Sequence, residues 1–298
     1  MASTEDDGDR LLRDYANGFM VSQVLFAACE LGVFDLLAEA PGPLSAAEVA
    51  AGLGASARGT ELLLEACVAL RLLRLDTRGG RALYASTLLS RRHLVSSSPT
   101  SQHHMLLYLA RTTYLCWGHL AQAVRDGKNQ YMKAFGVPSE DVFAAIYRSD
   151  AERLLFMRGL QGVWRVHGQH VLAAFDLSPF PVVCDLGGDF FTDPLPEADL
   201  YVLARVLHDW SHEKCVQLLA RVQQACRPGG ALLVIESLLD ADGRGPLTTQ
   251  LYSLNMLVQT EGQERTPGQY RELLAAAGFT DVECRRTGRP YDAVLARK

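Results

Sequence analysis

Apolar residues recur at three- and four-residue steps through the first part of the chain, and this spacing predicts a mainly helical N-terminal region. The apolar positions of the first expected amphipathic helix are Leu11, Leu12, Tyr15, Phe19, Met20, Val24, Leu25 and Ala28. Gly32 ends this helix, and a second, short helix is expected over residues 33–37.

The following segment carries the helix and turn signals of a winged-helix pattern. Ser45 is followed three residues later by Glu48, a spacing typical of a capping box, and the helix that they start is expected to end at Gly52 or Gly54. The elements expected after it are a helix over residues 57–73 and a hairpin of residues 73–76 and 81–84 around a Gly-Gly turn. Helix, turn, helix and hairpin follow one another in this order in winged-helix domains.

The pattern changes in the second part of the chain, where short apolar runs alternate with amphipathic helices. Strands are expected at residues 181–186, 198–204, 231–236, 281–287 and 291–297. Helices are expected at residues 104–125, 141–175, 211–226, 247–260 and 266–277. Alternating strands and helices indicate a doubly wound α/β domain. The Ser-rich run at 96–101 is a candidate linker, so the predicted domains are 1–100 and 101–298.

Composition and charge narrow the possible functions. The 298 residues are 48% hydrophobic and 21% charged, which indicates a globular protein. The net charge of −5 argues against binding to nucleic acid or acidic lipid. The second helix of the winged-helix pattern carries Glu61 and Glu65, whereas a helix in the major groove needs basic side chains. A packing or dimerisation module is therefore favoured over a DNA-binding one.

Other sequence features also argue against specialised sites. No apolar stretch is long enough to span a bilayer, and no signal peptide is visible, so a cytoplasmic protein is expected. The seven cysteines are scattered without a Cys-x-x-Cys pair, and the eight histidines show no metal-ligand spacing. We therefore expect reduced cysteines and no metal site.

Three groups of polar residues fall where the predicted strands end, the edge at which α/β sheets bind ligands. Asp185 precedes a Gly-Gly turn after the first strand. His208, with Asp209 beside it, follows the second strand and is a candidate general base. Glu236 ends the third strand, and Glu264 lies further along the chain. Carboxylates in these positions can orient an imidazole, although each could also be a surface charge.

These motifs in order, Asp-Leu-Gly-Gly, Val-Leu-His-Asp-Trp, Cys-Arg-Pro-Gly-Gly, Ile-Glu-Ser and Gly-Gln-Glu-Arg-Thr, resemble the small-molecule O-methyltransferases that use S-adenosylmethionine. The resemblance covers the whole chain. It implies an α/β protein with an N-terminal winged-helix dimerisation domain and a C-terminal Rossmann-like class I methyltransferase domain. Residues 14–40 and 251–262 are most similar to the vertebrate members that methylate a hydroxyindole. A homodimer, a hydroxyindole substrate and S-adenosylmethionine as methyl donor are thus implied.

The resemblance also assigns roles to individual residues. His208 matches the general base, and Glu236 and Glu264 match the carboxylates that flank it. The positions that match substrate contacts are Asp209, Asn255 and Gln259. The positions that match the cofactor site are Tyr147, Trp164, Asp185, Gly187, Gly188, Asp189, Phe190 and Arg205. Without the resemblance, Tyr147 and Trp164 would be interpreted as ordinary core residues.

The chain departs from the family in one place. Two βα units of about 30 residues each should separate Gly188 from the strand that begins at Ala198, but only residues 189–197 do so. We infer a splice-type deletion of strands two and three with their helices. It leaves the first and fourth strands as parallel neighbours, removes the acid that binds the cofactor ribose, and uncovers apolar surface. The junction lies within a Gly-Gly-Asp sequence shared by both motifs, so its position is not fixed to the residue.

Two functional interpretations follow from the sequence. In the first, the chain is a shortened methyltransferase whose activity is impaired. In the second, it is a non-catalytic form that acts by dimerising with full-length chains. The order of the remaining strands is left open.

Overall fold

The computed structural model describes residues 4–138 and 142–298, and the chain forms two compact units. The first unit holds the chain up to Thr112 together with Ser149–Arg165. The second unit holds Thr113–Arg148 and Val166–Lys298.

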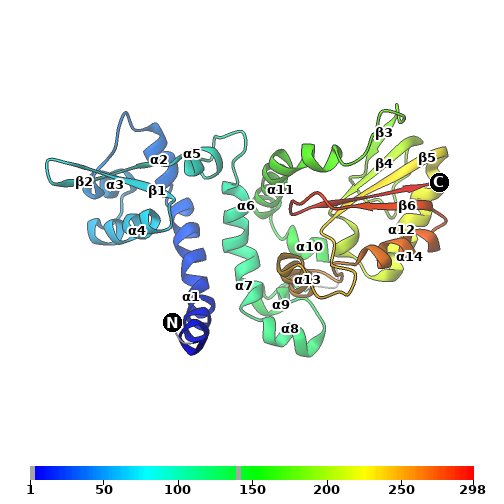
Figure 1. The fold of residues 1–298 in the computed structure, drawn as a ribbon, viewed down its shortest axis with the longest axis horizontal. Helices are drawn as coiled ribbons and strands as arrows, with labels where there is room; N and C mark the ends of the chain where they lie inside the picture. The colour runs from blue at the N-terminus through cyan, green and yellow to red at the C-terminus, as the bar shows by residue number, and fades with distance from the viewer. Residues whose placement is uncertain (1–3, 139–141) are drawn as a thin grey trace. The chain divides into compact units, whose positions relative to one another are not determined.

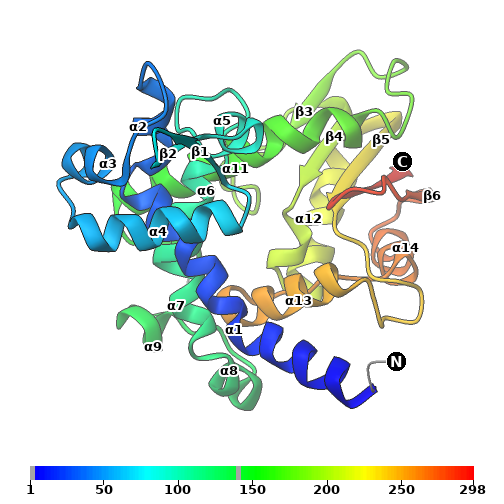
Figure 2. The same ribbon diagram turned by 60° about the vertical axis from the view of Figure 1, so that its left-hand side comes forward.

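The first unit has the predicted winged-helix pattern (Figure 2). Its helices are α1 (Thr4–Glu30), α2 (Val33–Glu39), α3 (Ala46–Leu53), α4 (Ala57–Ala69), α5 (Leu88–His93) and α6 (His103–Tyr108). The predicted hairpin consists of β1 (Leu73–Arg78) and β2 (Arg81–Ser86), which pair antiparallel. The capping box at α3 is present, with Ser45 and Glu48 bonding each other's backbone N–H groups. The helix predicted over residues 57–73 ends earlier, at Ala69, because Leu73 already belongs to β1.

The candidate linker at residues 96–101 is a fixed loop inside the first unit. The hydroxyls of Ser98 and Thr100 both donate to the backbone oxygen of Arg92, at 2.7 and 2.9 Å. Just beyond it, the Gln102 amide donates to the backbone oxygen of Gly162 on α11 (Asp150–Leu172) at 2.9 Å. The N-terminal part of α11 therefore packs on the segment after the loop, and the first unit extends beyond the predicted boundary at residue 100.

The second unit is built on a five-stranded sheet in the order β3-β4-β5-β7-β6 (Figure 1). Its strands are β3 (Val183–Asp185), β4 (Ala198–Ala204), β5 (Cys226–Glu236), β6 (Thr280–Arg285) and β7 (Asp292–Arg297). β3, β4 and β5 run parallel, and β7 runs antiparallel to both β5 and β6. The predicted α/β class and C-terminal hairpin are confirmed, and the strand order is now given.

Helices cover both faces of this sheet because its central strands are apolar on both sides. Tyr201 and Leu203 of β4 face a core shared with α12 (His212–Ala225) and α14 (Pro267–Ala276). The alternate residues of β4, Leu200 and Val202, pack with the C-terminal part of α11 and the segment after it. Period-two alternation thus sends neighbouring side chains of one strand into two different cores.

β3 is the edge strand of the sheet, and its neighbour β4 is parallel to it. Residues 186–197 connect the two strands without a helix, as the sequence predicts. Val182 and Val183 are 40% and 54% exposed, whereas the central strands β4 and β5 are mostly buried. The expected uncovering of apolar surface beside the deletion is therefore present.

The remaining elements differ from the sequence expectations in detail. They are a π-helical turn (Leu109–Thr113), α7 (Tyr114–Trp117), α8 (Leu120–Asp126), α9 (Tyr131–Phe135), α10 (Val142–Ile146), the 3-10 turn η2 (Leu207–Asp209) and α13 (Leu247–Gln259). The helix predicted over residues 104–125 is thus divided into short pieces. The one predicted to begin at Asp141 starts outside the described residues. Within the described part of the chain, no single helix is long and apolar enough to cross a membrane, whereas Asp7–Glu30 and Val33–Glu39 pass that test as a pair bent by 51°.

Candidate active site

His208 lies in the short turn η2, which directly follows β4 at the carboxyl end of the parallel strands. The chain leaves β4 at Arg205, which has a positive φ of 58° and donates its N–H to the backbone oxygen of Ile235 on β5. Leu207, two residues after Arg205, is fully buried and anchors the turn. His208 is 5% exposed, so its ring lies at the end of the sheet and largely out of solvent.

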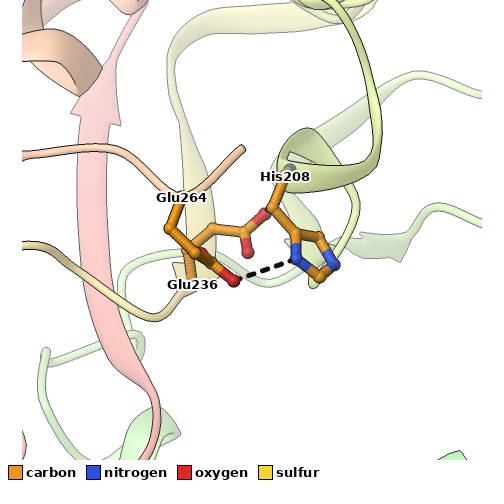
Figure 3. A group of neighbouring side chains, drawn as sticks. All are labelled: His208, Glu236 and Glu264. Carbon is orange, nitrogen blue, oxygen red and sulfur yellow. Dashed lines mark hydrogen bonds and ion pairs between the residues drawn. The ribbon is translucent and has the colours of Figure 1, made fainter. Parts of the chain in front are cut away.

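Two glutamates flank this histidine, as the sequence predicts (Figure 3). Glu236 ends β5 and accepts the backbone N–H of His208 at 3.2 Å. Glu264, from the loop between α13 and α14, lies 3.2 Å from Nδ1 of His208. Both carboxylates are buried. His208, Glu236 and Glu264 are far apart in the chain. They meet because β4 and β5 end at the same edge of the sheet and the loop that carries Glu264 lies at that edge.

Arg205 shares these carboxylates with His208. Its guanidinium donates to Glu236 at 2.9 Å and to Glu264 at 2.8 Å, and it also lies 5.2 Å from the ring centre of Tyr291. The resemblance assigns Arg205 to the cofactor site, but here its side chain belongs to the histidine cluster. The single positive charge of Arg205 reduces the repulsion between the two carboxylates in a buried site.

The hydrogen bonds of the His208 ring define its charge. Nδ1 faces Glu264, and Nε2 lies 3.1 Å from the backbone oxygen of Arg205 and 3.5 Å from a carboxylate oxygen of Asp209. All of these atoms are acceptors when the carboxylates are ionised, so both ring nitrogens carry hydrogen. Burial and the positive charge of Arg205 act to lower the pKa of His208. The negative charges of Asp209, Glu236 and Glu264 have the larger effect, so the pKa is raised. The ring contacts in this conformation therefore favour the imidazolium form of His208.

The carboxyl groups respond differently to the same surroundings. Burial acts to raise the pKa of Glu264, but the positive charges of Arg205 and His208 prevail and lower it to about 2. Burial raises the pKa of Glu236 and of Asp209.

One oxygen from each glutamate and one ring nitrogen of His208 lie within 4.8 Å of one another, a spacing that could hold a metal ion. The guanidinium of Arg205 already supplies a cation there.

Asn255 and Gln259 lie one turn apart on α13, as predicted, and they bond each other. The amide nitrogen of Gln259 donates to Oδ1 of Asn255 at 2.6 Å, and the indole N–H of Trp117 donates to the same oxygen at 2.9 Å. The hydroxyls of Thr113 and Tyr131 lie 3.4 Å from the amide oxygen of Gln259. Sequence reasoning missed these three partners, because residues more than a hundred positions away carry no local signal of the contact.

The turn after β3 is closed by its own carboxylates. Gly188 adopts a positive φ of 76°, which suits glycine. Asp189 accepts the backbone N–H groups of Phe191 and Thr192 and the hydroxyl of Thr192, at 2.6 to 3.3 Å. The hydrogen bond from Thr192 is the largest of the effects that lower the pKa of Asp189. Asp193 accepts the N–H of Asp189 at 3.1 Å. The N–H groups of Asp189, Phe191 and Thr192 are therefore occupied within the turn.

Aromatic residues connect this turn to the histidine turn. Phe191 packs edge-on against Trp210 at 4.9 Å between ring centres, and Phe190 lies 6.3 Å from the same ring. Phe143 contacts Trp210 at 5.3 Å and Tyr147 at 5.7 Å. Of the predicted cofactor residues, Phe190 and Tyr147 thus join one aromatic cluster.

The other predicted cofactor residues lie elsewhere. Asp185 and Gly187 occupy the end of β3 and the turn after it, and burial raises the pKa of Asp185. Trp164 lies on α11 in the first unit and is 37% exposed, so its part in a cofactor site stays a prediction.

Family models match most of the chain. A model described as an O-methyltransferase dimerisation domain matches residues 13–96. A model described as an O-methyltransferase domain matches residues 117–188 and again 187–280. The two matched stretches meet at Gly187 and Gly188, where the sequence predicts the deletion.

Named relatives and solved structures agree with these family models. The chain is 60% identical to bovine and 59% identical to human acetylserotonin O-methyltransferase, in both cases over the full length of each chain. Each alignment spans 345 positions, of which this chain of 298 residues leaves about 47 without a residue. The solved structure of human N-acetylserotonin methyltransferase in complex with SAM has a TM-score of 0.97 at 59% identity, covering 100% of this chain and 99% of that one. The PigF structure with SAH reaches 0.85 at 25% identity, covering 99% of this chain and 100% of that one.

Proposed function

Because the chain belongs to the O-methyltransferase family, we propose that its substrate is N-acetylserotonin and that its residues are arranged to methylate the 5-hydroxyl, giving melatonin. The observation that carries this proposal is the buried His208, bonded to Glu264 and placed at the carboxyl end of the sheet. The high identity to acetylserotonin O-methyltransferases over their full length supports the choice of substrate.

The chemistry assigned to the chain's own residues is proton removal and positioning. S-adenosylmethionine, when bound, supplies a methyl group on a sulfonium. His208 accepts the proton of the substrate hydroxyl, and Glu264 holds the ring through Nδ1 and stabilises the resulting imidazolium. Before it can do so, Nε2 must separate from the backbone oxygen of Arg205 and release its proton to water. The substrate hydroxyl is expected to take the place of that carbonyl.

The cofactor fits the residues present only in part. Asp185, Gly187 and Gly188 remain at the end of β3, but β3 is the edge of the sheet, and three of the turn amides bond Asp189 and Asp193. The strand that would carry the ribose acid is missing. Losing three or four hydrogen bonds at about 0.5–1.5 kcal/mol each would weaken binding roughly a hundredfold. We therefore propose that this shortened, splice-type form transfers methyl groups poorly.

The first unit carries an O-methyltransferase dimerisation domain, and we propose that it forms a homodimer. On α1, Leu12 and Tyr15 are 70% and 68% exposed, and Phe19 and Met20 are about half exposed. A row of apolar side chains of this size on one helix is typical of an interface between protein chains. No separate observation favours a non-catalytic partner of full-length chains.

The test of the proposed function compares the 298-residue chain with a version in which the missing segment is restored. Radiolabelled S-adenosylmethionine and N-acetylserotonin are supplied to both, and calorimetry measures cofactor binding. We expect methyl transfer by the restored chain and cofactor binding about a hundredfold weaker in the short one. Absence of transfer by the restored chain would reject the substrate. Equal cofactor affinity of the two chains would reject the proposed impairment.

A further inference from the structure

The hydrogen bonds around Asn255 leave only one possible orientation of its amide. The indole nitrogen of Trp117, at the end of α7, lies 2.9 Å from one terminal atom of the Asn255 amide. An indole N–H can only donate a hydrogen bond, so the atom that it faces must be the carbonyl oxygen. The amide of Asn255 is therefore oriented by Trp117, with its oxygen directed toward α7.

The orientation of Gln259 follows from that of Asn255. The Gln259 atom that lies 2.6 Å from the Asn255 oxygen must be a donor, which makes it the amide nitrogen. The Gln259 oxygen then faces the hydroxyls of Thr113 and Tyr131, both of which can donate. One obligatory donor, the indole of Trp117, thus fixes both amides of α13.

The consequence is that Asn255 presents N–H groups rather than a carbonyl to any ligand. Among the described residues, the amide nitrogen of Asn255 has no hydrogen-bond partner. This nitrogen is also not one of the fully buried polar atoms that lack a partner. Gln259 is 6% exposed and is held between Asn255, Thr113 and Tyr131. Asn255 is therefore able to donate a hydrogen bond to a substrate.

The same helix borders the catalytic cluster. The hydroxyl of Ser253 accepts the backbone N–H of Glu264 at 3.2 Å, and the ring of Tyr252 lies 5.8 Å from the guanidinium of Arg205. Asn255 follows these two residues by two and three positions on α13. A substrate whose hydroxyl reaches His208 would therefore extend along the helix that carries Asn255.

We propose that Trp117 is a specificity-determining positioning residue, which holds Asn255 as a hydrogen-bond donor and so selects hydroxyindoles whose side chain ends in a neutral amide. This inference rests on the proposed function. An acetamide carbonyl accepts from Asn255, whereas the ammonium group of a free amine finds donors where it needs an acceptor. A site that leaves such groups unpaired rejects the wrong ligand, and losing one such bond costs about tenfold in affinity.

The test measures binding of N-acetylserotonin and of serotonin to the full chain by calorimetry at pH 7.5. We expect the unaltered chain to prefer N-acetylserotonin by tenfold or more. In Trp117→Phe the Asn255 amide is free to turn over, and the preference is expected to fall below about threefold. In Asn255→Asp, which offers only acceptor atoms, serotonin should bind better than N-acetylserotonin. Gln224→Glu makes the same change of amide to acid at an exposed position of α12 and should keep the original preference.

Each outcome decides a separate point. If the unaltered chain prefers N-acetylserotonin and Trp117→Phe keeps that preference, the inference is overturned while the proposed function stands. If the unaltered chain binds neither indole, the proposed substrate fails and the inference fails with it. Should Trp117→Phe not fold, as judged by circular dichroism, Asn255→Asp decides, because an unchanged preference in that variant also overturns the inference.

Discussion

Gly262 lies so close to His208 that a side chain at position 262 would overlap the backbone carbonyl of His208. The neighbouring Glu261 donates its N–H to the backbone oxygen of Asp209 at 3.3 Å. From the same loop, the buried Arg265 donates to the backbone oxygens of Leu207 and Trp210, at 2.8 and 3.1 Å. The loop after α13 therefore holds the histidine turn on both sides of His208.

The contact of Gly262 predicts that Gly262→Ala destabilises the fold. The added methyl group would meet backbone atoms of His208 and Asp209. No flexible side chain can move aside to make room for it. We expect a loss of about 1–3 kcal/mol in the free energy of unfolding, the usual cost of overpacking. Urea denaturation measures it. Gly268→Ala is the matched control, since the nearest atom to its methyl group would be 3.6 Å away, and it is expected to be neutral or stabilising. A Gly262→Ala variant as stable as the control would contradict the close contact.

The lowered pKa of Glu264 predicts a loss of stability in acid. Its pKa falls from 4.5 to about 2 in the folded chain, so its contribution is present above pH 4.5 and is lost as the pH falls toward 2. The shift corresponds to about 3 kcal/mol as an upper value. The difference in unfolding free energy between the unaltered chain and Glu264→Gln should be largest above pH 5 and shrink below it. Urea titrations between pH 3 and pH 7 would show this, and a difference independent of pH would argue against the ion pairs with Arg205 and His208.

The raised pKa of His208 predicts the opposite pH dependence of stability. Its folded pKa is raised above 6.5, so the protonated ring stabilises the fold fully below pH 6.5, and this contribution is lost as the pH rises through the folded pKa. The stability difference between the unaltered chain and His208→Gln should therefore decrease from pH 6 to pH 9. NMR titration of the ring protons provides the independent measurement, and a pKa below 6.5 would refute the imidazolium assignment.

The exposed edge at β3 predicts self-association of the chain. Val183 is 54% exposed beside a strand edge with unpaired backbone groups, an arrangement that favours pairing with another chain. Val183→Lys is expected to reduce aggregation on heating, measured by light scattering, with little change in the midpoint of unfolding. Val294→Lys is the contrasting variant, because Val294 is fully buried in β7 and a charge there should unfold the chain. Equal aggregation of Val183→Lys and the unaltered chain would show that this edge is not the site of association.

The proposed catalytic role of His208 predicts different outcomes in the two forms of the chain. With the missing segment restored, His208→Ala should reduce methyl transfer by at least a hundredfold, the usual scale of general-base catalysis. In the 298-residue chain the same change should alter almost nothing, because the proposed loss of cofactor binding would limit the reaction first. A radiolabelled transfer assay on all four proteins tests both statements. Robust transfer by the short chain that disappears in His208→Ala would contradict the second.

The sequence by itself determined most of the elements and the main residues of the candidate site. Hydrophobic periodicity predicted the winged-helix pattern and the alternating strands, because local burial patterns follow the geometry of each element. The position of His208, Glu236 and Glu264 at strand ends and loops indicated a common site, because parallel strands end at one edge of a sheet. The missing βα units were also visible in the sequence, since the connection between two parallel strands has a minimum length.

Only the tertiary structure decided how these parts contact each other. Arg205 was assigned to a cofactor site, and its pairing with Glu236 and Glu264 depends on a backbone turn with positive φ that no local pattern reveals. The bond from Trp117 to Asn255 joins residues 138 positions apart. The direction in which an amide points is set by the hydrogen-bonding atoms around it in space. Sequence spacing indicates such contacts only when the residues lie within a few positions of each other in the chain.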